Sequence, residues 1–178
     1  MNSTFPFTAT ECVDAFTRGD CSAVEIAEAT LALIEKANPA LNAFIEITAS
    51  RMHREAALVD RARQLNQPLG TLAAVPYAVK NLFDVEGITT LAGAKLYEPY
   101  PPATRDADLV HKLNRAGGLL AGTLNMDAYA YGFTTENTHY GATHNPRNTT
   151  RSAGGSSGGT GAAVAARNAA RRPARERA

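Results

Sequence analysis

Length, composition and charge place this chain among ordinary globular proteins. Its 178 residues suit one domain, 44% of them are hydrophobic, and the net charge is +1. The last twelve residues carry five Arg and one Glu, a charge of +4, which leaves −3 for residues 1–166. An acidic body excludes the usual nucleic-acid-binding classes. With no membrane-length apolar run and no signal-peptide pattern, we expect a cytoplasmic protein that neither binds nucleic acid directly nor enters a membrane.

Cysteine and histidine patterns argue against metal or redox chemistry. Cys12 and Cys21 form no C-x-x-C motif, which is typical of reduced, idle thiols. The four histidines lack the spacing of metal ligands. We therefore expect neither a metal ion nor an organic cofactor.

Helix-capping patterns open the chain. Thr8 or Thr10 can cap a helix that stops at Gly19, and Ser22 with Glu25 forms a capping box that begins a second helix.

The second helix has one apolar face and is expected to end at Asn38-Pro39, because proline interrupts helices. A short strand is predicted within residues 41–47, followed by a helix over residues 50–67 that carries charges on most faces. Together these elements form a helical lead-in over residues 1–70.

The next part of the chain alternates strand, helix and strand. Residues 72–85 are apolar and β-branched, which indicates a buried strand with Lys80 at its end. Residues 104–125 predict a helix, a glycine turn and another strand, with three helix residues facing inward: Leu109, Val110 and Leu113. Such alternation indicates an α/β protein with at least partly parallel strands. Residues 131–150 are polar and turn-rich, and we expect a long loop there.

The stretch AGGSSGGT, residues 153–160, allows four interpretations. A flexible linker is the first, but GAAVAA follows at once. We therefore expect the loop to be held at a helix N-terminus, where backbone N–H groups gather and can bind an anion. A phosphate-binding P-loop is the second. Gly154 and Gly159 have the right separation, but Thr160 replaces the required lysine and no strand is expected before the loop, so we reject it.

A nucleophile elbow is the third interpretation, because the residues from Gly154 to Gly158 fit G-x-S-x-G. The elbow needs a strand before it, and an acid and a histidine after the serine. Here the preceding residues are polar, and neither His nor Asp follows Ser156. A Ser-His-Asp triad does not fit.

The fourth interpretation pairs a serine of the loop with a lysine. A neutral amine can activate a serine hydroxyl when burial or cationic neighbours lower the lysine pKa. Lys80, at the end of an apolar strand, is the candidate for this amine, although a strand-end lysine can also extend its ammonium group to solvent.

Several segments together resemble the amidase signature family. They are GTLAAVPYAVKNLFDVEGITTLAGAK, AGTLNMDAYAYGFTTENTHYGATHNPRN and AGGSSGGTGAAVAA, in that order, over about residues 72–166. The segment AYGFTTENTHYGATHNPRN is similar to the hydrolases of small urea-like amides, the carboxybiuret type. Ala153 replaces a frequent proline, and Thr160 a frequent serine. The resemblance implies an α/β/α fold with a mixed sheet between helix layers, of which this chain has the N-terminal part.

The resemblance also implies catalytic residues. Family members hydrolyse amides with a Ser–cis-Ser–Lys triad, in which Lys80 would accept the first proton and Ser156 would be the bridging serine with a cis peptide bond. Ser157 would supply a supporting hydrogen bond.

A substrate-binding segment follows from the same resemblance. Asn125, Met126 and Asp127 match residues beside the substrate pocket, although Asp127 can also simply cap the helix that it begins. The full-length parent would act on a small amide, and a partner subunit is possible because family members often work with one.

The nucleophile of the family triad is not expected in this chain. It lies about two dozen residues beyond the bridging serine, in a glycine-rich segment that also supplies the oxyanion donors. No serine follows Ser157 in these 178 residues. The Arg/Ala-rich tail over residues 167–178 does not resemble the family, which suggests a frameshift near codon 167. We therefore expect residues 71–166 to be the N-terminal part of a catalytic domain, inactive by itself and marginally stable, because strand edges and apolar faces are uncovered.

Three functions stay open at this point. The first is the amidohydrolase part just described. The second is an A-subunit-like part of a glutamine-dependent aminoacyl-tRNA amidotransferase, and the third is a fragment that binds a partner without chemistry. Binding of anions alone by the Gly/Ser loop is a further alternative.

Overall fold

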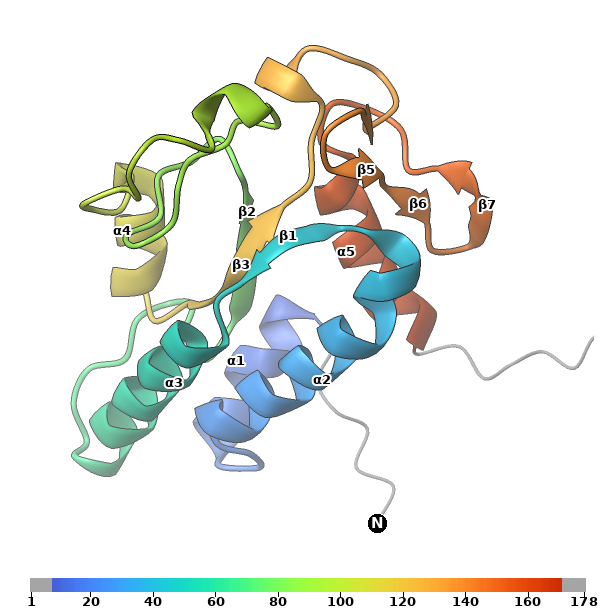
Figure 1. Ribbon diagram of the computed structural model, residues 1–178. Coiled ribbons are helices and arrows are strands. Elements are labelled where there is room, and N and C mark those ends of the chain that lie inside the picture. The colour runs from blue at the N-terminus through green and yellow to red at the C-terminus, as the bar shows by residue number, and fades with distance from the viewer. Residues whose placement is uncertain (1–7, 171–178) are drawn as a thin grey trace, which may run out of the picture.

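A three-stranded mixed sheet lies at the centre of the computed structural model, which describes residues 8–170 (Figure 1). The strand order is β1 (Phe44–Ile47), β3 (Leu119–Leu124), β2 (Pro76–Lys80). Strand β2 runs parallel to β3, and β1 runs antiparallel to it. The prediction of an α/β fold with a mixed, partly parallel sheet is confirmed.

Helices cover both faces of this sheet (Figure 1). Three of them share one core with β3: α1 (Ala9–Arg18), α2 (Ala23–Leu41) and α3 (Ala49–Gln64). Phe16, Ile26, Met52 and Leu119 in that core are fully buried. On the opposite face, Val110 of α4 (Asp108–Arg115) packs with Val79 and Leu120. No helix within residues 8–170 is long and apolar enough to cross a membrane.

The predicted capping box at Ser22 is present, and Thr8, one of the two predicted caps of the first helix, forms a second capping box. The Thr8 hydroxyl accepts the Glu11 N–H, and the Glu11 carboxylate accepts the Thr8 N–H. Ser22 and Glu25 make the same exchange at the start of α2. Gly19 follows α1 in the left-handed conformation with φ +79°, which glycine adopts without strain.

The predicted end of α2 at Asn38-Pro39 is wrong, because the helix continues through Pro39 to Leu41. Proline lacks the N–H that would bond within the helix, but hydrogen bonds to Asn38 stabilise the last turn. The Asn38 carbonyl accepts the Asn42 N–H at 2.7 Å, and its side chain bonds to the backbone of Ala43 and Phe44. These bonds place the start of β1 directly after the helix.

Only part of the predicted inner face of α4 is buried. Val110 is fully buried and Leu113 is half-buried, but Leu109 is 44% exposed, so its predicted inward position is wrong. The helix has only eight residues, and only Val110 of α4 is buried.

The predicted long loop over residues 131–150 is also wrong in part, because it contains two small antiparallel hairpins. One joins β4 (Glu136–Asn137) to β5 (Gly141–Ala142), and the other joins β6 (His144–Asn145) to β7 (Asn148–Ser152). Figure 1 shows them beside helix α5 (Gly158–Ala170). Polar sequences form such strands here because paired backbone groups, rather than apolar side chains, hold them.

A buried ionic cluster joins α3 to the rest of the fold. Arg51 donates two 2.7 Å hydrogen bonds to the Asp106 carboxylate and one to Glu55. Glu55 also accepts hydrogen bonds from the Asn114 side chain and from the Leu120 N–H. The predicted charges of α3 therefore include a buried carboxylate with a structural task.

The core contains residues from both sides of the predicted boundary at residue 70. Ala73, Ala74 and Val75 pack in the same cluster as the residues of α1 to α3. Helix α5 continues past residue 166 to Ala170, and the remainder of the Arg/Ala-rich tail, residues 171–178, lies outside the described residues.

Candidate active site

Lys80 and the segment after β3 meet at one edge of the sheet. Because β2 and β3 are parallel, their carboxyl ends lie side by side, and Lys80 pairs with Leu124. Asn125, Met126 and Asp127 follow immediately. Open α/β sheets bind ligands outside the carboxyl ends of their strands, so this edge is the place to expect chemistry.

Lys80 is half-buried, and its ammonium group forms no hydrogen bond or ion pair with another described residue. Burial lowers the pKa of Lys80 below its ordinary value, while the negative charge of Asp127 acts in the opposite direction. A lysine of this kind exchanges its proton more readily than an exposed one. The Lys80 environment therefore suits a proton acceptor.

Asn125 and Met126 are fully buried. The Asn125 amide group donates to the carbonyls of Asn42 and Gly141, and its oxygen accepts the Met126 N–H at 2.8 Å. Both side chains lie in the interior of the fold in this structure, and their contact with substrate stays a prediction.

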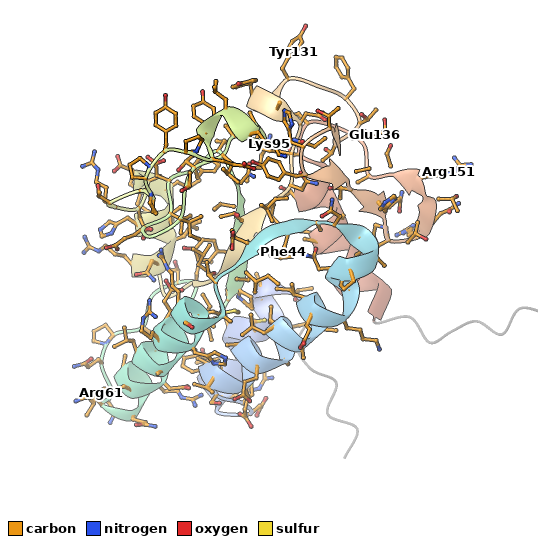
Figure 2. All side chains as sticks on the ribbon, viewed as in Figure 1. Phe44, Arg61, Lys95, Tyr131, Glu136 and Arg151 are labelled. Carbon is orange, nitrogen blue, oxygen red and sulfur yellow. The ribbon has the colours of Figure 1, made fainter. Side chains whose placement is uncertain are left out.

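Asp127 is a buried carboxylate with an unpaired oxygen. It is 8% exposed, and its Oδ2 atom has no hydrogen-bond partner within residues 8–170. Asp127 occupies the N-cap position of the following 3-10 helix η2 (Ala128–Ala130), as the alternative expected, but its side chain makes no capping hydrogen bond. The carboxylate lies against Gly132, where a Cβ atom would come within 2.2 Å of Oδ2. Figure 2 shows the Tyr131 side chain pointing outward at the top of the molecule.

Backbone hydrogen bonds fix the Gly/Ser loop. Gly154 and Gly155 have φ values of +82° and +72°, and their N–H groups donate to the Thr134 and Phe133 carbonyls at 3.3 and 2.7 Å. The Asp127 N–H donates to the Ser156 carbonyl at 3.3 Å. The linker interpretation is therefore wrong, because the loop is held at the N-terminus of α5, beside the segment that follows β3.

The first four N–H groups of α5 have acceptors in this structure. The N–H of Gly158 bonds to the Thr135 hydroxyl and that of Gly159 to the Asn125 carbonyl. The N–H groups of Thr160 and Gly161 bond to the Ser157 carbonyl. Anion binding by the loop stays a prediction, and it would not use these four donors.

The two serines differ in exposure. Ser156 is half-buried and Ser157 is exposed, and neither hydroxyl forms a hydrogen bond with another described residue. No peptide bond among residues 8–170 is cis, so the predicted cis bond at Ser156 is wrong for this structure. Before a residue other than proline the trans form is favoured by about 3 kcal/mol. The supporting bond from Ser157 stays a prediction.

A strand does precede the Gly/Ser loop, contrary to the expectation used against the P-loop and elbow interpretations. Strand β7 ends at Ser152, but it pairs only with β6 in a hairpin outside the central sheet. The P-loop interpretation still fails because Thr160 occupies the lysine position, and the elbow interpretation fails because β7 is not a strand of the central sheet.

Sequence reasoning missed Thr135 as a site residue. It is fully buried with φ +52°, its hydroxyl donates to the Gly155 carbonyl, and the same hydroxyl accepts the Gly158 N–H at 2.8 Å. One side chain thus holds both ends of the Gly/Ser turn. Thr135 belongs to a T-E-N segment that is part of the family resemblance, and this was the available signal. The surrounding residues are polar, so hydropathy does not predict that Thr135 is buried.

Asn137 was missed for the same reason. Its amide group donates to the carbonyls of Gly93 and Met126 at 2.7 and 2.8 Å, and its oxygen accepts the N–H groups of His139 and Tyr140. It therefore fixes the backbone immediately before Asp127. Within residues 8–170, no group of three acidic, histidine or cysteine side chains gathers as a metal site would require.

Known proteins match most of this chain. The family model described as Amidase matches residues 25–170. The chain is 53% identical over 145 residues to AtzE of Pseudomonas sp. (strain ADP), a subunit of 1-carboxybiuret hydrolase, and the match covers 82% of this chain and 32% of that protein. It is 40% identical over 137 residues to the A subunit of glutamyl-tRNA(Gln) amidotransferase from Synechococcus sp. (strain CC9605), with 77% and 28% covered.

Solved structures match in the same way. A chain of a vestigial protein complex, described as revealing the evolutionary origins of an s-triazine catabolic enzyme, superposes with a TM-score of 0.88 at 52% identity, covering 89% of this chain and 35% of that one. A bacterial aryl acylamidase of the amidase signature family gives a TM-score of 0.83 at 34% identity, with 90% and 34% covered. The chain thus spans about a third of the length of the relatives that it matches.

Proposed function

Because this chain belongs to the amidase signature family, we propose that it carries the lysine and the bridging serine of a site that hydrolyses carbon–nitrogen amide bonds. One observation carries the proposal. The hydrogen bond from the Asp127 N–H to the Ser156 carbonyl joins the Gly/Ser loop to the sheet edge where Lys80 ends β2.

In the proposed reaction Lys80 and Ser156 move a proton. The neutral Nζ of Lys80 takes the hydroxyl proton of Ser156, and Ser156 takes the proton of an attacking serine as that oxygen bonds to the amide carbon. When the C–N bond breaks, the proton returns by the same path to the leaving nitrogen. The lowered pKa of Lys80 supports its part as the acceptor.

The 178 residues as given contain no serine after Ser157, so we propose that they supply the relay without the attacking atom. The purified chain is then expected to hydrolyse no amide from a panel of urea-like, aryl and glutamine amides. Hydrolysis that disappears in Lys80→Ala, but persists in Lys95→Ala, would show that the chain has a nucleophile of its own.

A chimera tests the proposed roles directly. Residues 1–166 would be followed by the corresponding remainder of the Pseudomonas relative, which supplies an attacking serine. We expect this protein to hydrolyse amides, Lys80→Ala and Ser156→Ala each to lower kcat by at least about 100-fold, and Lys95→Ala to leave it unchanged. An active Lys80→Ala chimera would contradict the proposal.

A small urea-like amide of the carboxybiuret type is the substrate class that we favour. The higher identity to the 1-carboxybiuret hydrolase relative supports it, whereas the matching amidotransferase relatives support the alternative, release of ammonia from glutamine. A second chimera, completed by the remainder of the Synechococcus relative, distinguishes them: if both chimeras give the higher kcat/KM for the same one of carboxybiuret and glutamine, the part from this chain sets the preference.

Partner binding without chemistry is the second candidate function. An apolar cavity of about 590 Å³ lies between α2, β2 and α5, and β2 pairs only with β3 among the described strands. A pull-down with the full chain tests this function. Capture that is unchanged in Lys80→Ala supports it, whereas isolated residues 1–70 are unsuitable because their core includes residues beyond 70.

A further inference from the structure

Among the residues that the structure describes, the Asp127 carboxylate is the charged group whose field acts on the Lys80 ammonium, and it has no other evident task. Its Oδ2 atom is buried without a hydrogen-bond partner in that part of the chain, and its side chain makes no capping hydrogen bond to η2. A buried, unpaired carboxylate oxygen is costly and calls for an explanation. Its surroundings give one.

The backbone of Asp127 is linked to the segments that carry both proposed relay residues. On one side it lies three residues after Leu124, the strand partner of Lys80. On the other side its N–H donates to the Ser156 carbonyl. Asn137 fixes the preceding Met126 carbonyl, so the backbone that carries Asp127 is anchored.

Gly132 allows the carboxylate to occupy its place. A Cβ atom at Gly132 would come within 2.2 Å of Oδ2 and 2.4 Å of Cγ of Asp127. Any larger residue would therefore push the carboxylate out of this position. Glycine at 132 and aspartate at 127 form one packed unit.

We propose that Asp127 supports the lysine through its charge: its fixed carboxylate stabilises the ammonium that forms when the Lys80 amine holds the relay proton. The proposal rests on the proposed function, because it assigns Lys80 the same task. No bond changes at Asp127. The proton rests on Nζ, and the carboxylate only lowers the free energy of that charged state.

Competitive labelling of the lysines tests this in the full 178-residue chain. Acetic anhydride reacts with neutral amines, and mass spectrometry compares Lys80 with three internal references: Lys36, Lys95 and Lys112. The Asp127→Asn change keeps the shape of the side chain but removes the charge that raises the pKa of Lys80. Labelling of Lys80 at pH 8 relative to the references should therefore rise about twofold or more.

Asp84→Asn is the matched control, because it removes a carboxylate four residues from Lys80 that does not act on it. We expect unchanged Lys80 labelling in that variant. In Gly132→Ala the displaced carboxylate should raise Lys80 labelling, as Asp127→Asn does. If circular dichroism shows that Asp127→Asn is unfolded, Asp127→Ala, which removes the charge and relieves the packing against Gly132, is measured instead.

Unchanged Lys80 labelling in a folded Asp127 variant would overturn the proposal, and so would an equal rise in Asp84→Asn. The readout needs no catalysis. If neither the chain nor the chimera hydrolyses an amide, the proposed function is wrong, but the labelling result for Asp127 is still valid.

Discussion

The helix-covered face of the sheet and the Gly/Ser end of the molecule are held in different ways. The α1 to α3 face is stabilised by fully buried apolar side chains such as Phe16, Ile26 and Met52. At the other end, Thr135 and Asn137 hold glycine-rich turns through hydrogen bonds to backbone groups. Apolar packing tolerates small shifts, whereas a hydrogen-bonded turn has one geometry, which suits the placing of reacting groups.

The largest loss of stability should come from a substitution in the apolar core beneath α1 to α3. Phe16 is fully buried, and the Arg63 guanidinium lies 4.1 Å from its ring centroid. Phe16→Ala should lower the free energy of unfolding by about 3–5 kcal/mol through lost burial and the cavity left behind. Because we expect the wild-type chain to be marginally stable, this variant should be unfolded without denaturant when measured by far-UV circular dichroism.

Leu58→Ala is the control for that change, since Leu58 is 67% exposed. It should change the free energy of unfolding, measured by urea titration, by no more than about 0.5 kcal/mol. A Phe16→Ala variant as stable as Leu58→Ala would show that this cluster is not the core that holds the fold.

Two glycines of α5, Gly159 and Gly161, test how closely this helix approaches the neighbouring backbone. A Cβ atom at Gly159 would come within 2.5 Å of the Asn125 carbonyl oxygen and 2.7 Å of the Ala43 carbonyl oxygen, whereas one at Gly161 would meet open space. Gly159→Ala should therefore destabilise by about 1–3 kcal/mol, because backbone atoms must move. Gly161→Ala should stabilise by about 0.5–1 kcal/mol, because alanine favours the helix. Opposite shifts of the urea midpoint are the expected result, and equal shifts would contradict the close approach.

The hydroxyl of Thr135 carries the next effect. Thr135→Val keeps the shape but leaves the Gly158 N–H without its acceptor, at a cost of about 1–3 kcal/mol. Hydrogen exchange should become faster at the amides of Gly155 and Gly158, with the α1 to α3 amides changing less. Thr134→Val is the neighbouring control, because the Thr134 side chain is exposed and makes no hydrogen bond to another described residue. Equal exchange in both variants would rule out the Thr135 clamp.

The smallest effect concerns pH. Hydrogen bonds from Arg51 hold the pKa of Asp106 below its ordinary value, although burial opposes them. A depressed carboxylate pKa gives stability that is present above the unfolded pKa of about 3.9 and lost as pH falls through the folded value. Stability should therefore decline below about pH 5 less steeply in Asp106→Asn than in wild type, measured as urea midpoints from pH 3 to pH 7. Parallel curves would show that Asp106 is not coupled to folding.

Local sequence signals predicted where the first two helices start and that strand, helix and strand alternate along the chain. The capping boxes at Thr8 and Ser22 involve residues three apart, so the backbone forms them wherever the rest of the chain lies. The apolar run ending at Lys80 likewise predicted strand β2, because burial on both faces requires such a run. Family resemblance added Ser156 and the Asn125 to Asp127 segment.

Tertiary structure alone decided the hydrogen-bond partners of polar residues whose partners are distant in sequence. Thr135 meets the Gly/Ser turn across twenty residues, and the Asp127 N–H meets Ser156 across nearly thirty. Sequence patterns report which side chains avoid water, whereas the partner of a buried hydrogen-bonding group is set only when distant segments of the chain pack together.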